Sequence, residues 1–154
     1  MKTLKQISLL CLFWMIGMGA WAYDFTVNGI YYNYLDETAK TCAVTSGTTK
    51  YTGSVTIPST VTYNSVDYTV TQIGHMAFYE CEDLTSVTMP NTVTDISGYS
   101  FMKCTGLSSV TIPNSVYSIG QNAFYGCTGF TYVQIPNSAK YIRNYAFYGC
   151  IYEA

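Results

Sequence analysis

The chain has 154 residues, a formal net charge of −2 at pH 7, 49% hydrophobic residues and only 10% charged residues. This length is that of a single domain, and the lack of a basic stripe or tail argues against nucleic acid as a partner. The abundance of Tyr, Thr, Ser and Val favours strands.

Residues 1–22 have the three parts of an export signal. Lys2 and Lys5 form the positive start, Ile7 to Met18 an apolar core, and Ala20-Trp21-Ala22 a small-x-small cleavage site. We predict cleavage after Ala22, which would leave 132 residues with a formal charge of −4, because five of the seven basic residues and all nine acidic ones follow it. The apolar run is shorter than the roughly 20 residues that cross a bilayer. We therefore expect a secreted or cell-surface protein with no membrane span after signal removal.

Residues 23–72 are predicted to form a β-rich N-terminal cap that includes the first rung of a repeat. Asn28-Gly29 lies between two strand-like runs within Phe25 to Leu35 and is a strong hairpin signal. Asn64-Ser65 marks a second tight turn between two alternating strands. Such a cap would shield the end of the core that a stack of coils otherwise exposes to water.

Residues 73–154 repeat with a period of 23, in three complete units and a truncated fourth. The unit reads I-x-x-x-[AS]-F-x-x-C-x-x-[LF]-x-x-V-x-[IM]-P. A fixed period of this kind is typical of a solenoid, in which each coil stacks on the next. The main columns of the alignment are Ile73, Ile96, Ile119 and Ile142; Phe78, Phe101, Phe124 and Phe147; Cys81, Cys104, Cys127 and Cys150; and Val87, Val110 and Val133.

Each unit is predicted to contain one strand and one short helical turn. Val110 and Ile112 share one face of the strand, which Pro113 ends because it has no N–H to donate. Ala123-Phe124 is expected to form the helical turn and to insert an aromatic anchor. One coil cannot bury these residues alone, whereas stacked coils pack equivalent residues on one another.

The pattern is incomplete after Cys150, where the next strand is missing. The predicted strand Thr131 to Ile135 therefore has no neighbour on its outer side, and an unpaired edge invites association. Two interpretations stay open: the chain is a truncated piece of a longer array, or it self-associates through this C-terminal edge.

The phrases "IGQNAFYGCTGF" and "VTIPNSV" resemble the BspA-like class of leucine-rich repeats. The stretch "VTIPSTVTYNSVDYTVTQIG", Val55 to Gly74, is similar to that family's opening rung. The resemblance implies a repeat solenoid: a leucine-rich-repeat-like right-handed coil with a parallel β-sheet face and short helical turns, behind the β-rich cap. It also implies an exported, adhesive binding module, since family members are linked to extracellular-matrix and plasma proteins and to coaggregation between bacteria.

The cysteines allow three interpretations. Cys81, Cys104, Cys127 and Cys150 recur at the repeat period, which would bring neighbouring thiols within reach of a disulfide in an oxidising compartment. Cysteine is also a common small core residue, and we expect core packing. Cys42 lies outside the column and leaves an odd count, and the lack of a C-x-x-C pair disfavours zinc.

The motifs that could indicate catalysis or metal binding are explained by the repeat. His75 is the only histidine and occupies a variable position. Ser100 to Lys103 matches an S-x-x-K pattern, but Ser100 stands where the other units carry alanine. Glu80, Glu82 and Asp83 form an acidic cluster that the other units do not repeat. We therefore predict no enzyme, no catalytic residue, no cofactor and no metal.

The outward side chains of the predicted strands form an uncharged, hydroxyl-rich ladder that could bind an extended partner. A second recurring series is aromatic, and tyrosine is enriched at recognition surfaces. Both series also suit cross-strand pairing within a stack. The expected partner is a protein or an extracellular-matrix-type macromolecule, and the alternative function is a non-catalytic scaffold or array fragment. The candidate binding face comprises Ser54, Thr56, Ser86, Thr88, Ser109, Thr111, Tyr132 and Gln134, with Tyr79, Tyr125 and Tyr148 as the aromatic series.

Overall fold

The structure is a computed structural model that describes residues 23–150. The predicted export signal lies outside these residues. Within the described part of the chain there is no helix long and apolar enough to cross a membrane. The strands are β1 (Phe25–Val27), β2 (Ile30–Asp36), β3 (Thr41–Thr45), β4 (Gly53–Thr56), β5 (Thr60–Tyr63), β6 (Val66–Ile73), β7 (Leu84–Thr88), β8 (Asp95–Ile96), β9 (Ser109–Thr111), β10 (Ser118–Ile119) and β11 (Tyr141–Ile142).

Two hairpins form at the turns that the sequence predicted within residues 23–72. Asn28 and Gly29 join β1 to β2 with φ angles of 51° and 79°. Asn64 and Ser65 join β5 to β6 with φ angles of 49° and 62°. Two successive left-handed residues define the turn whose twist matches that of antiparallel strands, and Asn and Gly adopt this conformation most readily.

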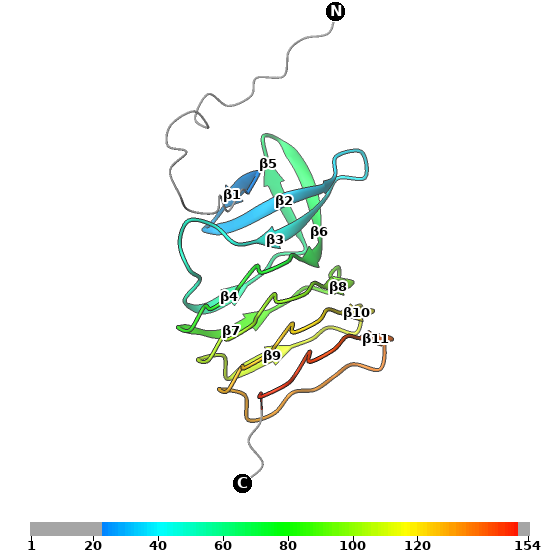
Figure 1. Cartoon of the computed structure of the whole chain (residues 1–154). Coiled ribbons are helices and arrows are strands. Elements are labelled where there is room, and N and C mark those ends of the chain that lie inside the picture. The colour runs from blue at the N-terminus through cyan, green and yellow to red at the C-terminus, as the bar shows by residue number, and fades with distance from the viewer. Residues whose placement is uncertain (1–22, 151–154) are drawn as a thin grey trace, which may run out of the picture.

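The cap is hydrogen-bonded directly to the coils. β6 pairs antiparallel with β5 and parallel with β3, and its last residues, Gln72 and Ile73, pair parallel with β8. One sheet therefore runs from the cap into the coils in the order β1-β2-β3-β6-β8-β10-β11. Figure 1 shows the cap strands at one end and the coils stacked below them.

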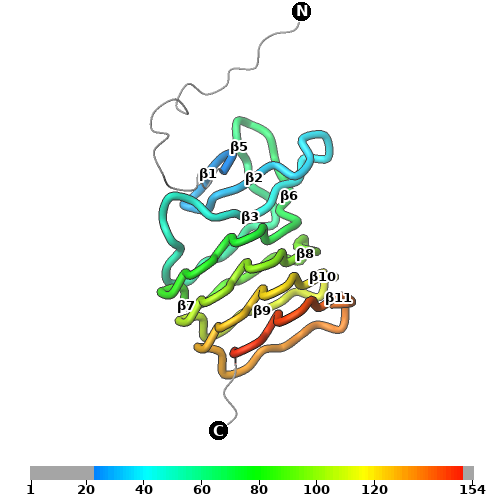
Figure 2. The backbone as a smooth tube through the Cα atoms, viewed as in Figure 1, coloured from blue at the N-terminus to red at the C-terminus, as the bar shows by residue number. Residues whose placement is uncertain are grey.

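Two parallel ladders hold the coils together. The front ladder, β4-β7-β9, sets Val55 beside Val87 and Val87 beside Val110. The back ladder, β8-β10-β11, sets Ile96 beside Ile119 and Ile119 beside Ile142. Equivalent residues of neighbouring units are therefore in register, and the successive coils run parallel through the tube of Figure 2. This confirms a leucine-rich-repeat-like, strand-rich coil.

The expected short helical turns are absent from residues 23–150. The segments around Phe78, Phe101 and Phe124 are turns. In each of them, every second backbone N–H donates a hydrogen bond to a carbonyl of the next coil. The Phe78 N–H donates to the Ser100 carbonyl at 2.7 Å, and the Phe101 N–H donates to the Ala123 carbonyl at 2.7 Å. A helix would direct these N–H groups to its own carbonyls. Left-handed residues, Met76 and Glu80 in the first of these segments, also interrupt the helical conformation.

The predicted strand at residues 131–135 is also absent. This segment has no strand hydrogen bonding, and no backbone hydrogen bond joins it to β9 within the described residues. Val133 packs against the core only partly, and Ile135 is 43% exposed. No described coil covers the segment from its other side, so ordering it as a strand would bury little additional apolar surface.

The core consists of the inward columns. The rings of Phe78, Phe101 and Phe124 are fully buried and stack on one another with centroids 4.8 Å and 4.9 Å apart. Ile73, Ile96 and Ile119 form a second fully buried column. In the fourth coil, Phe147 is only partly buried and Ile142 is 46% exposed. The cap therefore covers one end of the core, whereas core residues of the fourth coil are partly exposed at the other end.

Candidate functional site

The hydroxyl-rich ladder lies on the outward side of the front ladder. Ser54, Ser86 and Ser109 are cross-strand neighbours, and Thr56, Thr88 and Thr111 form the next row in the same register. The Ser86 hydroxyl donates to the Ser54 hydroxyl at 2.8 Å. The side chains of both rows are exposed apart from that of Ser86, which is half-buried. Their hydroxyls can both donate and accept hydrogen bonds, and they carry no charge.

A groove of about 470 Å³ opens at the free edge of β9. Its lining includes Ser109 and Thr111 of β9 together with Tyr132 and Gln134. The backbone of residues 131–135 does not pair with β9, so the hollow lies where a further strand of the ladder would sit. An unpaired strand edge presents backbone N–H and C=O groups to a partner. The groove thus combines backbone groups, hydroxyls, an amide and one aromatic ring that is 69% exposed.

The aromatic series lies apart from this groove. Tyr125 and Tyr148 stack with ring centroids 5.3 Å apart. Tyr79 is separated from them in the column by Met102, and the Lys50 ammonium lies 5.4 Å from its ring centre. None of the three tyrosines lines the groove at β9. The candidate binding residues therefore form two surfaces rather than one.

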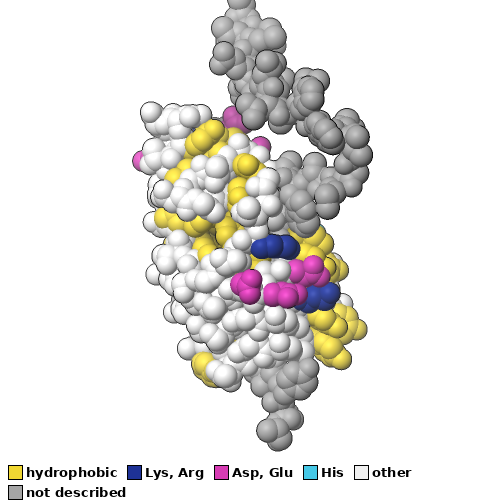
Figure 3. All heavy atoms as spheres, turned by 90° about the vertical axis from the view of Figure 1, so that its left-hand side faces the viewer, with side chains coloured by type: hydrophobic (Ala, Val, Ile, Leu, Met, Phe, Trp, Pro, Cys, Tyr) yellow, Lys and Arg dark blue, Asp and Glu magenta, His cyan; other side chains and the backbone are white. Residues whose placement is uncertain are grey.

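A small charged cluster surrounds Tyr79. Lys103 Nζ donates to Glu80 Oε1 at 3.1 Å, and this hydrogen bond is the main cause of a lowered pKa for Glu80 and a raised pKa for Lys103. A hydrogen bond with Glu80 also raises the pKa of Tyr79. Figure 3 shows charged side chains gathered on a surface that is otherwise mostly neither charged nor apolar. These groups are exposed, so the pair stabilises the turns only weakly.

The five described cysteines are free and buried. The thiols of Cys104, Cys127 and Cys150 donate to the carbonyls of Phe78, Phe101 and Phe124 at 2.9, 3.0 and 2.8 Å. Each thiol therefore bonds the preceding coil as well as filling the core. Burial raises the pKa of Cys81 to about 11 and that of Cys42 to about 12, which keeps both thiols protonated and weakly reactive at neutral pH.

His75, Ser100 and Lys103 lie in three different surroundings. His75 is exposed, and its ring meets the ring of Tyr99 edge-on at 5.5 Å. Ser100 is fully buried, and its hydroxyl oxygen has no hydrogen-bond partner within the described chain. The side chain of Lys103 is instead bonded to Glu80. Across residues 23–150, no three His, Cys, Asp or Glu side chains are placed to hold a metal ion.

The sequence interpretation missed the outward side of the back ladder. Gln72, Asp95, Ser118 and Tyr141 form one row across β6, β8, β10 and β11. β8, β10 and β11 have only two residues each, too few to show alternation of polar and apolar positions. The alignment at period 23 contained the signal, because each of these four residues precedes an isoleucine of the repeat column by one position.

Comparison with known proteins identifies the type of repeat. The family model described as "BspA type Leucine rich repeat region" matches residues 50–153 in six copies. No curated protein matches the chain. The chain is similar to the crystal structure of a leucine-rich repeat protein from Bacteroides ovatus, with 33% identity over 82% of this chain and a TM-score of 0.71. It is also similar to a leucine rich cell surface protein from Faecalibacterium prausnitzii, with 34% identity over 82% of this chain and a TM-score of 0.70.

The chain spans only 33% and 34% of the length of those two proteins. A leucine-rich repeat protein from Bacteroides capillosus is matched over 93% of its length, with 25% identity, 82% coverage of this chain and a TM-score of 0.69. The similarity therefore extends to a structure of comparable size as well as to parts of longer ones.

Proposed function

The chain belongs to the BspA-type leucine-rich repeat family, and on that premise we propose that it is an exported, non-catalytic binding module. It acts at the bacterial surface or after secretion, and it makes protein-protein or adhesive contacts with host or neighbouring-cell macromolecules. Leucine-rich repeat solenoids typically use their extended faces for binding.

The groove at β9 is the observation that carries this proposal. Its lining joins the unpaired edge of β9, with Ser109 and Thr111, to Tyr132 and Gln134. An extended peptide can add to such an edge through its backbone, while neighbouring side chains select its sequence. The uncharged walls favour hydrogen bonding and apolar contact over ion pairing. An extended segment of a protein is therefore the ligand class that fits best.

Two observations support export. Residues 1–22 match the pattern of a secretory signal, and one structural relative is named a cell surface protein. Expression of the full chain in a bacterium with a general secretion pathway tests this point. The exported product should begin at Tyr23 by N-terminal sequencing. A product that keeps Met1 in the cytoplasm would contradict it.

Binding is tested with the full chain on a coated extracellular-matrix protein preparation from which sulfated polysaccharides have been removed. Thr111→Arg places a long charged side chain in the groove and should abolish saturable binding. Thr128→Arg introduces the same side chain at another exposed threonine, outside the groove, and should bind like the parent. Equal binding by the parent and both variants would exclude the groove as the site.

Self-association through the open end is the second candidate function. In the inner coils, alternate turn N–H groups bond the following coil, as those of Asn122 and Phe124 do. The equivalent N–H groups of Tyr145, Phe147 and Gly149 make no hydrogen bond to any described residue. Tyr145 and Tyr148 are 64% and 60% exposed at the same end. A second copy could satisfy these donors and cover the rings.

Sedimentation separates the two functions. A monomer whose sedimentation coefficient does not change with concentration, together with saturable matrix binding, would support the binding module. A concentration-dependent oligomer that Tyr145→Arg dissociates would support the scaffold.

A further inference from the structure

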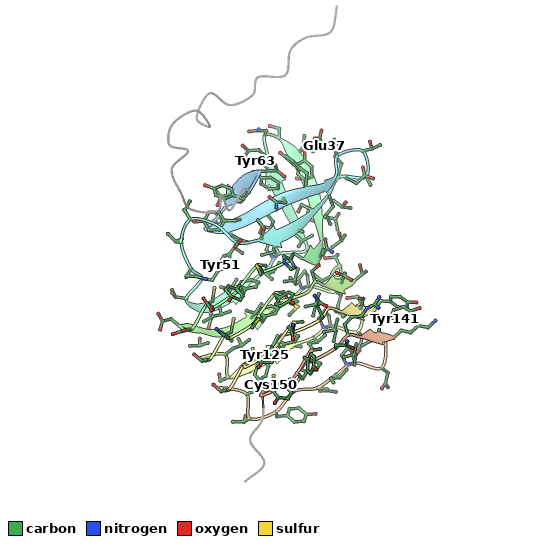
Figure 4. The ribbon with its side chains drawn as sticks, viewed as in Figure 1. Glu37, Tyr51, Tyr63, Tyr125, Tyr141 and Cys150 are labelled. Atoms are coloured by element: carbon green, nitrogen blue, oxygen red, sulfur yellow. The ribbon has the colours of Figure 1, made fainter. Side chains whose placement is uncertain are left out.

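Four aromatic and basic side chains gather beside the back ladder in its last two coils. The rings of Tyr117 and Tyr141 lie 5.2 Å apart at an angle of 80°. Lys140 Nζ lies 5.9 Å from the ring centre of Tyr117 and 6.0 Å from that of Tyr141. The guanidinium carbon of Arg143 lies 5.7 Å from the ring centre of Tyr141. We call these residues the aromatic-basic patch, and Figure 4 shows Tyr141 pointing away from the body of the coil.

The patch is accessible, and its shape is partly fixed. Tyr117 and Tyr141 are 46% and 44% exposed, and Lys140 and Arg143 are exposed as well. The edge-on contact between Tyr117 and Tyr141 restricts both rings. Contact with the rings also restricts both cations. A ligand would therefore meet a surface that is already arranged.

The positive charge of the patch is not neutralised within the described chain. Neither Lys140 nor Arg143 forms an ion pair with a described residue, whereas Lys103 is paired with Glu80. Residues 96–150 contain three basic residues and no Asp or Glu. Asp95, on the same outward side, is two strands from Tyr141 and accepts hydrogen bonds from Gln72 and Ser97. An anionic ligand is thus the complement of this surface.

A polar hollow adjoins the patch. It has a volume of about 400 Å³ and is lined by Gln121, Arg143 and Asn144. The guanidinium group presents several N–H donors in a fixed plane, and each amide adds two donors and an acceptor. Ser118, which pairs with Tyr141, and Gly120, which follows β10, are small residues of the adjoining coil. The hollow can therefore hold an anionic group and the hydroxyls next to it.

We propose that the aromatic-basic patch binds a linear sulfated polysaccharide. The exposed rings offer apolar surfaces on which the C–H faces of sugar rings can pack. Both cations lie within 6.0 Å of the Tyr141 ring, so they can meet anionic groups on adjoining sugars. Arginine binds oxyanions with two parallel hydrogen bonds, and lysine adds a point charge. The amides of the hollow can bond sugar hydroxyls.

Other anionic polymers fit less well. An extended acidic peptide would add to a strand edge through its backbone, whereas the patch presents side chains on the outward side of the ladder. Duplex nucleic acid calls for a basic stripe, whereas this chain has a net charge of −2. The patch is separate from the groove at β9, so this proposal does not depend on the proposed function.

The test measures binding of a heparin octasaccharide to the full chain by calorimetry. The patch variant carries Lys140→Gln with Arg143→Gln, and the matched control carries Lys40→Gln with Lys103→Gln, which removes the same charge elsewhere. Tyr141→Ser tests the ring. Circular dichroism melting establishes that each variant is folded.

We expect saturable binding that weakens with added salt, at least about tenfold weaker in the patch variant and in Tyr141→Ser. The control should stay within about twofold of the parent. Three results would overturn the proposal: no binding by the folded parent, equal losses in the patch and control variants, or equal binding of a desulfated octasaccharide. Equally effective competition by polyglutamate would show that the patch recognises charge alone, and would also overturn it.

Discussion

The phenyl ring of Phe101 stacks on that of Phe78, with centroids 4.8 Å apart and planes inclined by 6°. The ring of Phe124 lies on the other side of Phe101 at 4.9 Å and 3°. All three rings are fully buried. Residues 23 positions apart in the sequence are thus stacked directly on one another in the core, and each contact links two successive coils.

Phe101→Ala should lower the free energy of unfolding by about 3–5 kcal/mol, because it opens a cavity between two stacked rings. Phe147→Ala is the control, since Phe147 is only partly buried and stacks on Phe124 alone among the described phenylalanines. Urea denaturation should show a loss less than half as large for Phe147→Ala. If the two variants lost equal amounts of unfolding free energy, a ring stacked between two coils would stabilise the protein no more than the partly buried ring at the end of the column.

Ser100→Ala should stabilise the protein by about 1–2 kcal/mol. The Ser100 hydroxyl is fully buried without a partner within the described residues, and Ala77, Ala123 and Ala146 occupy the same position in other units. Removing the oxygen therefore removes a desolvation penalty and leaves a side chain that the site accepts elsewhere. The measurement is the urea midpoint. Ser109→Ala, at an exposed serine, should leave it within about 0.5 kcal/mol. A lower midpoint for Ser100→Ala would show that the hydroxyl is bonded in solution.

The sequence predicted the columns because the repeat period and the burial pattern give the same information. Ile96 and Ile119 align in the sequence, and the structure places them side by side in the back ladder. The two hairpins were predictable because Asn28-Gly29 and Asn64-Ser65 adopt local conformations that do not depend on tertiary contacts.

Prediction from the sequence was wrong where hydrogen bonds between coils determine the conformation. The turn around Phe78 is not helical because its N–H bonds a carbonyl 22 residues away, which no local pattern reveals. The segment 131–135 repeats the letters of a strand, but it does not pair with β9, and no described coil covers its outer side. For the same reason, the groove at β9 could not be located from the binding-face residues alone.

Gly120→Ala should lower the free energy of unfolding by about 3 kcal/mol or more. A Cβ atom at this position would lie 2.3 Å from the backbone nitrogen of Gly98, so the two coils would have to separate. Gly126→Asn is the control. Its φ is +69°, which asparagine tolerates, and the nearest atom to a new Cβ, Lys103 Cγ, is 3.7 Å away. Thermal melting should show a change of less than about 1 kcal/mol for this control. A similar effect of both substitutions would contradict the close approach of the coils at Gly120.

Stability should fall at alkaline pH. Burial raises the pKa of Cys81 to about 11, that of Cys42 to about 12 and that of Tyr34 to about 12. The folded state therefore holds these protons more tightly than the unfolded state, whose thiols titrate near pH 9. Their contribution is fully present below pH 9 and is lost as the pH rises through about 11 and 12. Urea midpoints between pH 7 and 11.5 should show this fall.

Cys81→Ala should reduce the alkaline fall, because it removes the group that titrates first among the three. The quantity compared is the slope of the urea midpoint against pH, measured for the parent and for the variant. The effect of the substitution that does not depend on pH therefore cancels. An unchanged slope would show that Cys81 is ionised equally in the folded and unfolded states.

Duplicating one repeat tests whether residues 23 positions apart stack in columns. A second copy of residues 97–119, inserted after Ile119, adds one 23-residue unit and preserves every column. The denaturation midpoint and the denaturant dependence should both rise, because another coil buries more surface. An insertion of residues 97–118 shifts the register by one residue and should destabilise the fold. If the two insertions lowered the midpoint equally, residues 23 positions apart would not form the columns described above.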